Sequence, residues 1–229
     1  MKAVSFDVKG KLAHFRRPDT TTTQLTYPFI TPTAAKGLVG AILGIEDFVT
    51  SDMIGIQLLS PVRTVAQQLS MLGKDTGSAF NRPTTIEVLV NPAYRIYYAG
   101  DEYIDMLTEY LKKDHAVYPT YLGSAYALTK PMKGKTYDNV QIKKGSRIRV
   151  TTKTVIPTVL IKELCLDDNR HYMRAGGFMY AYKGKRTFEK SVDFIYEGEG
   201  KSISFIPNTD TSMLETKIAL LGDEVVCLI

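Results

Sequence analysis

The 229-residue chain has no tryptophan, only two cysteines and only three histidines. Cys165 and Cys227 stand far apart, which argues against a disulfide framework or a zinc site. No apolar run approaches the ~20 residues of a membrane-spanning helix, and the chain opens with a strand pattern rather than a signal peptide. We therefore expect a cytoplasmic protein with no metal, no other cofactor and no membrane partner.

Acidic residues are scarce in one part of the chain. Residues 130–190 contain 15 Lys and Arg but only 5 Asp and Glu, whereas the whole chain has 29 against 24. A run of like charge is often only a solvated surface. A basic concentration of this size also suits a partner that carries phosphate groups.

The most informative stretch is 15–44, FRRPDTTTTQLTYPFITPTAAKGLVGAILG. Thr31 is a good N-cap, Pro32 suits the first helical position and Gly44 suits a C-terminal stop, so we expect a helix over 32–43. Small residues recur on it every three or four positions: Ala34, Gly37, Ala41 and Gly44. Such a stripe predicts close packing of this face on a sheet.

The first half of the chain contains further strand and helix patterns. Strands are expected at 2–9, 53–67, 85–98 and 121–128. Pro61 should bend the second strand, Asn91-Pro92 should kink the third, and Asp101 should cap a helix that ends at Lys113. The order strand, helix, strand, strand, helix, strand predicts an α+β fold of the ferredoxin-like β-α-β-β-α-β type, as in RNA-recognition domains.

The second half has short strand patterns separated by glycine turns. A short helix is possible over 211–221. We therefore expect two units: a ferredoxin-like domain over 1–129 and a smaller β-rich region over 130–229.

Two stretches resemble a known family. FRRP, the threonine-rich loop, LTYP, TP and GLVGAILG are similar to the start of CRISPR-associated protein family five, a member of the RAMP superfamily. YPTYLGSAYA at 118–127 resembles the family's Pro-x-x-Leu-Gly segment after the second helix. The overall similarity is greatest to type I-B.

This resemblance implies a subunit that holds the 5′ handle of the guide crRNA in a type I Cascade complex. The implied partners are the guide crRNA, the repeated backbone subunit, the large subunit and, through the complex, target DNA. The segment 67–84 resembles the family's thumb, which projects over the guide beside the first backbone subunit. Its positive tip carries Lys74, Phe80 and Arg82; the alternative for this segment is a flexible surface loop.

The residue types in these stretches indicate how a single-stranded handle can be held. Positive side chains bind phosphates, and aromatic rings stack on splayed bases. The phosphate candidates are Arg16, Arg17, Lys36 and Arg63. The stacking candidates are Phe15, Tyr27, Tyr121 and Tyr126, although each tyrosine can equally belong to the core. Gly123 and Ser124 allow an RNA strand to approach the backbone closely.

Some type I-C relatives cut the guide precursor without a metal, through a tyrosine, a lysine and an adjacent histidine. Tyr27, Lys113 and His115 are the nearest equivalents, but Asp114 separates the last two and adds negative charge. We therefore expect a non-catalytic RNA-binding subunit. A metal-independent endoribonuclease is the first alternative. A stand-alone RNA-recognition module is the second, and the long insertion argues against it.

Overall fold

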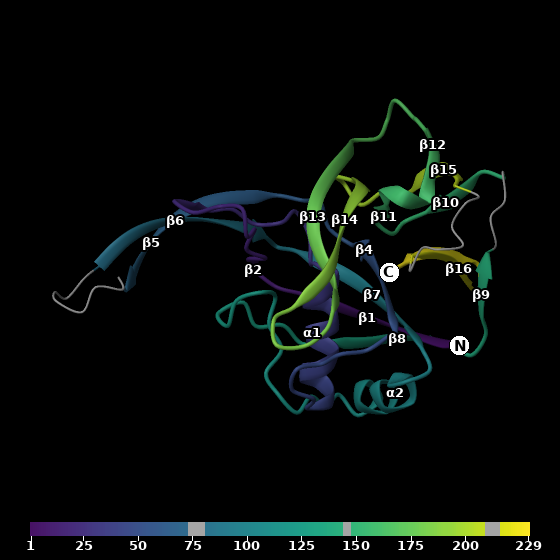
Figure 1. Ribbon diagram of the computed structural model, residues 1–229, viewed down its shortest axis with the longest axis horizontal. Coiled ribbons are helices and arrows are strands. Elements are labelled where there is room, and N and C mark those ends of the chain that lie inside the picture. The colour runs from purple at the N-terminus through teal and green to yellow at the C-terminus, as the bar shows by residue number, and fades with distance from the viewer. Residues whose placement is uncertain (73–80, 144–147, 209–215) are drawn as a thin grey trace.

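The computed structural model describes residues 1–72, 81–143, 148–208 and 216–229 (Figure 1). The fold is mixed α+β and consists mostly of strands. Within these residues, no helix combines the length and the apolar character needed to cross a membrane.

The central element is an antiparallel sheet with the strand order β4-β7-β1-β8. Its strands are β1 (Lys2–Lys9), β4 (Met53–Leu58), β7 (Ala93–Gly100) and β8 (Met132–Tyr137). Helix α1 (Pro32–Leu43) comes between β1 and β4 along the chain, and α2 (Ile104–Lys112) follows β7. One face of the sheet packs on both helices. The other face packs on β16 (Lys217–Leu221) and β17 (Glu224–Leu228).

Strand β1 shows why both faces are covered. The strand predicted over 2–9 is confirmed, and its alternating residues Val4, Phe6 and Val8 are all completely buried against the helices. Ser5 on the opposite face is buried as well, and its Oγ accepts the Lys135 N–H at 2.9 Å. The strand is therefore buried on both faces, where alternation predicted one solvated face.

The prediction of α1 is confirmed at both ends. Thr31 Oγ1 accepts the Ala34 N–H at 3.0 Å, and Gly44 closes the helix with a φ of 74°. The predicted small-residue stripe fails as a packing face at Gly37, which is exposed and whose Cβ would meet nothing within 4 Å, whereas Ala34 packs against the core and Gly44 lies close to Val117. The core instead receives Leu38, Val39, Ile42 and their neighbours on the apolar face.

Helix α2 begins at Ile104, and Asp101 does not cap it. The carboxylate of Asp52, which precedes β4, accepts the N–H groups of the three residues before the helix: Asp101, Glu102 and Tyr103. These bonds measure 3.0, 3.2 and 3.1 Å, and Asp52 is buried. A distant residue therefore satisfies the backbone donors at this helix start.

We expect Asp52→Ala to lower the free energy of unfolding by about 2–4 kcal/mol, because three backbone donors lose their acceptor. Asp52→Asn keeps one acceptor oxygen, so its free energy of unfolding should lie between those of the wild type and Asp52→Ala. Urea unfolding followed by circular dichroism measures the difference. Asp105→Ala, which removes an exposed ion pair with Lys2, is the control and should have a much smaller effect. Equal losses in Asp52→Ala and Asp105→Ala would contradict the capping role.

The predicted strands 53–67 and 85–98 each divide between two sheets. β4 ends at Leu58, and β5 (Thr64–Leu72) leaves the central sheet to pair with β6 (Asn81–Val90). Two breaks cause this: Pro61 lacks an N–H for the ladder, and Asn91, with a φ of 49°, precedes Pro92. β5 and β6 form a long hairpin that projects from the body of the molecule (Figure 1).

Short strands β2 (Leu12–Ala13) and β3 (Thr23–Gln24) pair with β6 at the base of this hairpin. Much of the segment predicted as a long loop is therefore strand. Residues 73–80 of that segment, with Lys74 and Phe80, lie outside the described residues.

The predicted strand 121–128 is wrong. Tyr121 and Leu128 form only an isolated bridge, and the chain turns back between them. Gly123 has a φ of 83°, which interrupts an extended conformation. β8 supplies the fourth strand of the central sheet instead.

The remaining chain forms three small sheets in the orders β10-β15-β12, β11-β14-β13 and β17-β16-β9. Their other strands are β9 (Val140–Lys143), β10 (Val150–Thr152), β11 (Ile156–Pro157), β12 (Ile161–Cys165), β13 (Tyr172–Tyr182), β14 (Phe188–Glu197) and β15 (Ile203–Pro207), with a 3-10 helix, η1 (Thr158–Leu160). The predicted helix 211–221 is wrong over Lys217–Leu221, which is β16; 211–215 lies outside the described residues.

One hydrophobic core joins the two halves of the chain. Phe178 of β13 and Phe194 of β14 are buried against Phe29, at centroid distances of 4.9 and 5.7 Å. β13 also contacts α1. The hairpin β13/β14 therefore covers the segment that precedes α1 (Figure 1).

Candidate nucleic-acid interface

The loop between α2 and β8 displays aromatic side chains on a fixed backbone. We call residues 118–128 the aromatic loop. The Leu122 N–H donates to the Ala127 carbonyl at 2.8 Å, and both side chains are buried. Tyr121 and Tyr126 between and beside them are 46% and 57% exposed. Both rings thus present open faces, as stacking on an unpaired base requires.

Gly123 seats this loop on the segment that follows β2. A Cβ on Gly123 would lie 2.1 Å from the His14 carbonyl oxygen and 2.9 Å from the Phe15 ring. The His14 N–H also donates to the Leu122 carbonyl at 3.1 Å. The loop therefore lies directly beside the segment that carries Arg16. This close approach explains the glycine: it serves packing inside the protein, and Ser124 follows half-buried.

The two predicted arginines differ in availability. Arg16 is exposed and forms no ion pair with a described carboxylate. Arg17 binds Asp19 through two hydrogen bonds, Nε to Oδ1 at 3.1 Å and Nη2 to Oδ2 at 2.7 Å. The pKa of Asp19 is lowered by this hydrogen bond. Arg16 is therefore the better candidate for a phosphate, since Arg17 already has an anionic partner.

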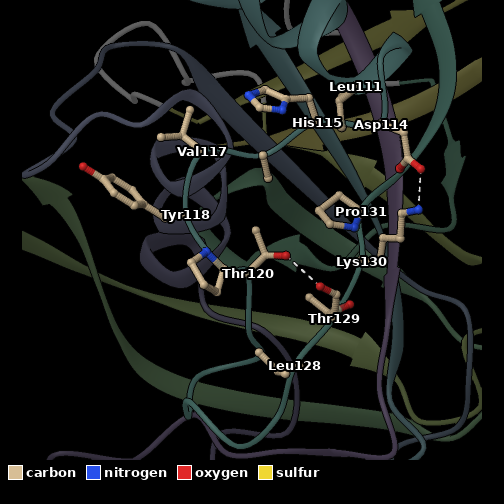
Figure 2. A pocket seen from close by; sticks show the side chains of 12 residues that line it. Leu111, Asp114, His115, Val117, Tyr118, Thr120, Leu128, Thr129, Lys130 and Pro131 are labelled. Atoms are coloured by element: carbon tan, nitrogen blue, oxygen red, sulfur yellow. Dashed lines mark hydrogen bonds and ion pairs between the residues drawn. The ribbon is translucent and has the colours of Figure 1, made fainter.

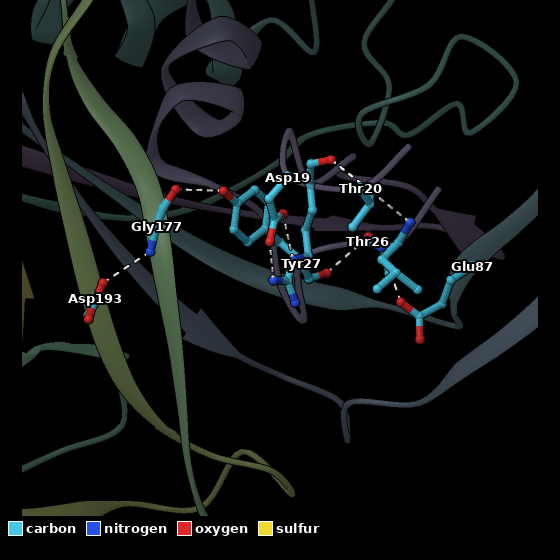
Figure 3. A network of polar contacts seen from close by, with 9 residues as sticks. Asp19, Thr20, Thr26, Tyr27, Glu87, Gly177 and Asp193 are labelled. Atoms are coloured by element: carbon cyan, nitrogen blue, oxygen red, sulfur yellow. Dashed lines mark hydrogen bonds and ion pairs between the residues drawn. The ribbon is translucent and has the colours of Figure 1, made fainter. Parts of the chain in front are cut away.

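Phe15 and Tyr27 lie in the core. Phe15 is 4% exposed, and Tyr27 is 6% exposed with its ring 4.3 Å from that of Phe178. The Tyr27 hydroxyl donates to the Gly177 carbonyl at 2.6 Å (Figure 3), and burial raises the pKa of this phenol. A base can stack on neither ring in this arrangement, and both rings stabilise the packing of β13 or of the central sheet instead.

The other basic candidates occupy two different places. Lys36 is half-buried on α1, where its Nζ donates to the Thr50 carbonyl at 3.4 Å and lines a small pocket beside β13. Arg63 and Arg82 are exposed on the projecting hairpin. Arg63 lies at its base, since its carbonyl accepts the Val90 N–H, and Arg82 pairs in register with Met71.

A cleft of about 420 Å³ opens between the end of α2 and the aromatic loop (Figure 2). Its lining is mostly apolar: Leu111, Ala116, Val117, Tyr118, Pro119, Leu128 and Pro131. His115 stands at the rim, and an ion pair joins Asp114 to Lys130 across the opening. Asp114 adopts a φ of 54°, which turns the chain out of α2 and into the cleft wall.

The structure does not bring the three residues of the catalytic alternative together. The Lys113 ammonium binds Glu109 at 2.5 Å on α2, which raises the pKa of the lysine. Lys113 does not line the cleft that His115 lines. Within the described chain, no contact links Tyr27 to either of them. The described residues also contain no cluster of three or more His, Cys, Asp or Glu side chains that could hold a metal.

Sequence reasoning missed three residues of this region. Tyr118 and Leu128 are exposed beside the cleft, at 42% and 64%, and nothing in the local sequence separates them from core positions. His14 is buried, and its ring Nδ1 donates to the Glu87 carbonyl at 2.7 Å. Because a carbonyl only accepts, the proton of neutral His14 lies on Nδ1.

Burial lowers the pKa of His14 below its usual value, because the imidazolium would lose its water. The unfolded state then binds more protons than the folded state once the pH falls below about 6.5. We expect the free energy of unfolding to decline as the pH drops through that region. His14→Gln should flatten this decline in urea titrations at pH values of about 7 and 5. An unchanged slope in the variant would contradict the assignment.

Comparison with known proteins finds similarity in the first part of the sequence and in the fold. Residues 3–68 match the sequence model of a family described as CRISPR-associated protein (Cas_Cas5). No curated protein matches the chain in sequence. A solved CRISPR protein from Archaeoglobus fulgidus is similar over 99% of each chain, with a TM-score of 0.59 and 15% identity.

A chain of a CRISPR RNA-guided surveillance complex is also similar. The match covers 90% of this chain and 92% of that chain, with a TM-score of 0.55 and 11% identity. At these identities the similarity concerns the fold. The protein thus has the α+β fold of solved CRISPR proteins over nearly its whole length, and its first strands and α1 carry the sequence signature of a CRISPR-associated family.

Proposed function

We propose that this protein is a non-catalytic subunit of a type I CRISPR Cascade complex and binds the 5′ handle of the guide crRNA. The observation that carries this proposal is that the loop with exposed Tyr121 and Tyr126 packs through Gly123 on His14 and Phe15, the residues just before exposed Arg16. Rings with open faces stack on unpaired bases, and a free guanidinium binds the phosphate between them. The family match of residues 3–68 supports the assignment.

The fold supports two finer parts of the proposal. The order β4-β7-β1-β8 supports a ferredoxin-like unit, because along the chain α1 comes between β1 and β4, the first two strands of this sheet, and α2 comes between β7 and β8, its last two. The β5/β6 hairpin corresponds to the thumb and contacts the adjacent backbone subunit. β5 is exposed and has no charged residue, which suits a protein partner better than phosphates. The complex also includes the large subunit and target DNA, is of type I-B and works in the cytoplasm.

Two alternatives remain open to test. A metal-independent endoribonuclease needs a base beside the 2′-hydroxyl and an acid beside the leaving oxygen. The cleft holds His115, but the Tyr27 hydroxyl and the Lys113 ammonium have protein partners elsewhere. A stand-alone RNA-recognition module has no use for a long projecting hairpin. Both alternatives are therefore less well supported than a non-catalytic subunit that binds the 5′ handle.

The experiment incubates the purified protein with a labelled RNA of its own CRISPR repeat in EDTA and resolves it on native and denaturing gels. We expect a shift on the native gel and intact RNA on the denaturing gel. A discrete cut that disappears in His115→Ala would contradict the non-catalytic role and support the endoribonuclease. The absence of any shift at micromolar protein would contradict RNA binding altogether.

A variant of Tyr27 separates structure from catalysis. Tyr27→Phe keeps the ring against Phe178 and removes the hydrogen bond to Gly177. We expect the free energy of unfolding to fall by about 1–2 kcal/mol, with unchanged RNA affinity below the unfolding transition. Urea unfolding and fluorescence anisotropy with labelled RNA measure the two quantities. If wild-type protein cleaves the RNA and this variant does not, Tyr27 belongs to an active site.

A further inference from the structure

The cleft between α2 and the aromatic loop lies beside the proposed stacking surface and is not used by it. We propose that this cleft receives one base of the bound RNA, rotated out of the strand. This inference rests on the proposed RNA-binding function and adds a defined base pocket to it. Its volume of about 420 Å³ lies within the range of about 300–1,000 Å³ that is usual for small-molecule pockets.

The walls of the cleft suit the flat faces of a base. Leu128 on one side and Val117 on the other are 64% and 46% exposed, so both leave apolar surface in contact with water. Pro119 and Pro131 complete the wall with rings that have no N–H to desolvate. A planar ring inserted there would remove all of this surface from water.

The rim supplies a group that can read the edge of a base. His115 is exposed, and its ring nitrogens make no hydrogen bond within the described chain. The ring packs against Tyr110 at a centroid distance of 5.1 Å, which limits its orientations. A neutral imidazole offers one donor and one acceptor, and bases present both on their edges.

The charges around the cleft favour a polyanion. The two acidic groups nearby are already paired, Asp114 with Lys130 and Glu109 with Lys113. Lys9 lies beside the cleft, because its backbone exchanges hydrogen bonds with Thr129. Lys112 follows Leu111 of the cleft wall, and both Lys9 and Lys112 are exposed and form no ion pair with a described carboxylate. Phosphates on either side of the inserted base would therefore meet uncompensated positive charge.

Continuity with the stacking surface favours a nucleic acid over a protein side chain. Leu128 of the cleft wall forms a backbone bridge with Tyr121, whose ring is open to solvent. An RNA strand that stacks on Tyr121 thus passes the mouth of the cleft. An apolar side chain from a partner protein would fill the walls equally well, but it would leave the lysines without partners.

The test combines single abasic sites in the RNA with variants that fill or alter the cleft. Fluorescein-labelled repeat RNAs, each with one abasic nucleotide, are titrated by anisotropy against wild-type protein and Leu128→Trp. Abasic positions that remove a base from Tyr121 or Tyr126 should weaken binding to both proteins, and we expect one further position, that of the base in the cleft, to weaken wild-type binding about tenfold. Leu128→Trp should weaken the binding of intact RNA by a similar factor. Its affinity should no longer depend on that abasic position, since the tryptophan and the abasic site remove the same contact. Leu166→Trp, at another exposed leucine, is the matched control.

His115→Ala is the second variant, because an exposed side chain can be changed without threat to folding. It should lower the affinity for intact RNA and leave the affinity for RNA with the sensitive abasic site unchanged. Sensitivity at abasic positions that is the same in wild-type protein and Leu128→Trp overturns the base pocket and leaves the stacking on Tyr121 and Tyr126 in place. Equal affinity at every abasic position overturns both the base pocket and the stacking. Full abasic sensitivity in Leu128→Trp overturns the base pocket as well. So does unchanged RNA affinity in Leu128→Trp together with loss of a partner subunit. No binding by wild-type protein overturns both proposals.

Discussion

Gly123→Ala is expected to lower the free energy of unfolding by at least about 3 kcal/mol. Two costs add at this position. The φ of 83° disfavours any residue with a Cβ, and the new methyl would lie 2.1 Å from the backbone carbonyl of His14. The backbone at His14 cannot move aside as a flexible side chain can, so the aromatic loop must shift away from it. Urea unfolding measures the loss, and RNA affinity should fall with it.

Two other glycines separate the contributions. Gly222 has a φ of 59° and open space around its Cβ position, so Gly222→Ala reports the conformational cost alone, about 1–2 kcal/mol. Gly37 lies in α1 with a Cβ position that meets nothing, so Gly37→Ala should be neutral or stabilise the helix by about 0.5–1 kcal/mol. A loss in Gly123→Ala no larger than that in Gly222→Ala would show that the loop does not pack on His14.

Arg16→Glu is expected to weaken the binding of repeat RNA by about tenfold or more and to lower the salt dependence by about one ion. A phosphate contact is lost and replaced by repulsion beside the stacking rings. Arg17→Glu should have the smaller effect, because Arg17 is already paired with Asp19. The double variant should resemble Arg16→Glu. Anisotropy titrations between about 50 and 200 mM salt give affinity and slope together.

Lys217→Glu is the control for charge itself. Lys217 is exposed on β16, outside the aromatic loop and the hairpin, and its reversal changes the net charge by the same amount. We expect little change in affinity. Equal losses in Lys217→Glu and Arg16→Glu would mean that the RNA responds to overall charge, and Arg16 would then have no specific role.

Local signals in the sequence identified α1 correctly, because its caps lie within the helix's own neighbourhood. Thr31 and Gly44 act on backbone groups three or four residues away. The start of α2 could not be found in this way. Its acceptor is Asp52, which stands 49 residues before the first N–H that it binds. A cap contributed through tertiary structure leaves no mark beside the helix.

The same distinction applies to the candidate site. The motif around Phe15 and Tyr27 was recognised, but burial depends on partners such as Gly177, 150 residues beyond Tyr27. The prolines at 61 and 92 were recognised as interruptions. Whether a strand bends or joins another sheet depends on the strand with which it pairs, and β5 pairs with β6. Tyr121 and Tyr126 were selected by type, and their exposure keeps them in the candidate surface.

The most direct test of the account is to locate the RNA on the protein. Repeat RNA that contains 4-thiouridine is crosslinked by ultraviolet light, and tryptic peptides that carry RNA are identified by mass spectrometry. Trypsin does not cut the Lys130-Pro131 bond, so cleavage after Lys113 and Lys133 releases residues 114–133, which hold the aromatic loop and most of the cleft wall. The account predicts crosslinks concentrated in this peptide. Crosslinks confined to residues 134–229 would contradict it and place the RNA on the basic second half of the chain.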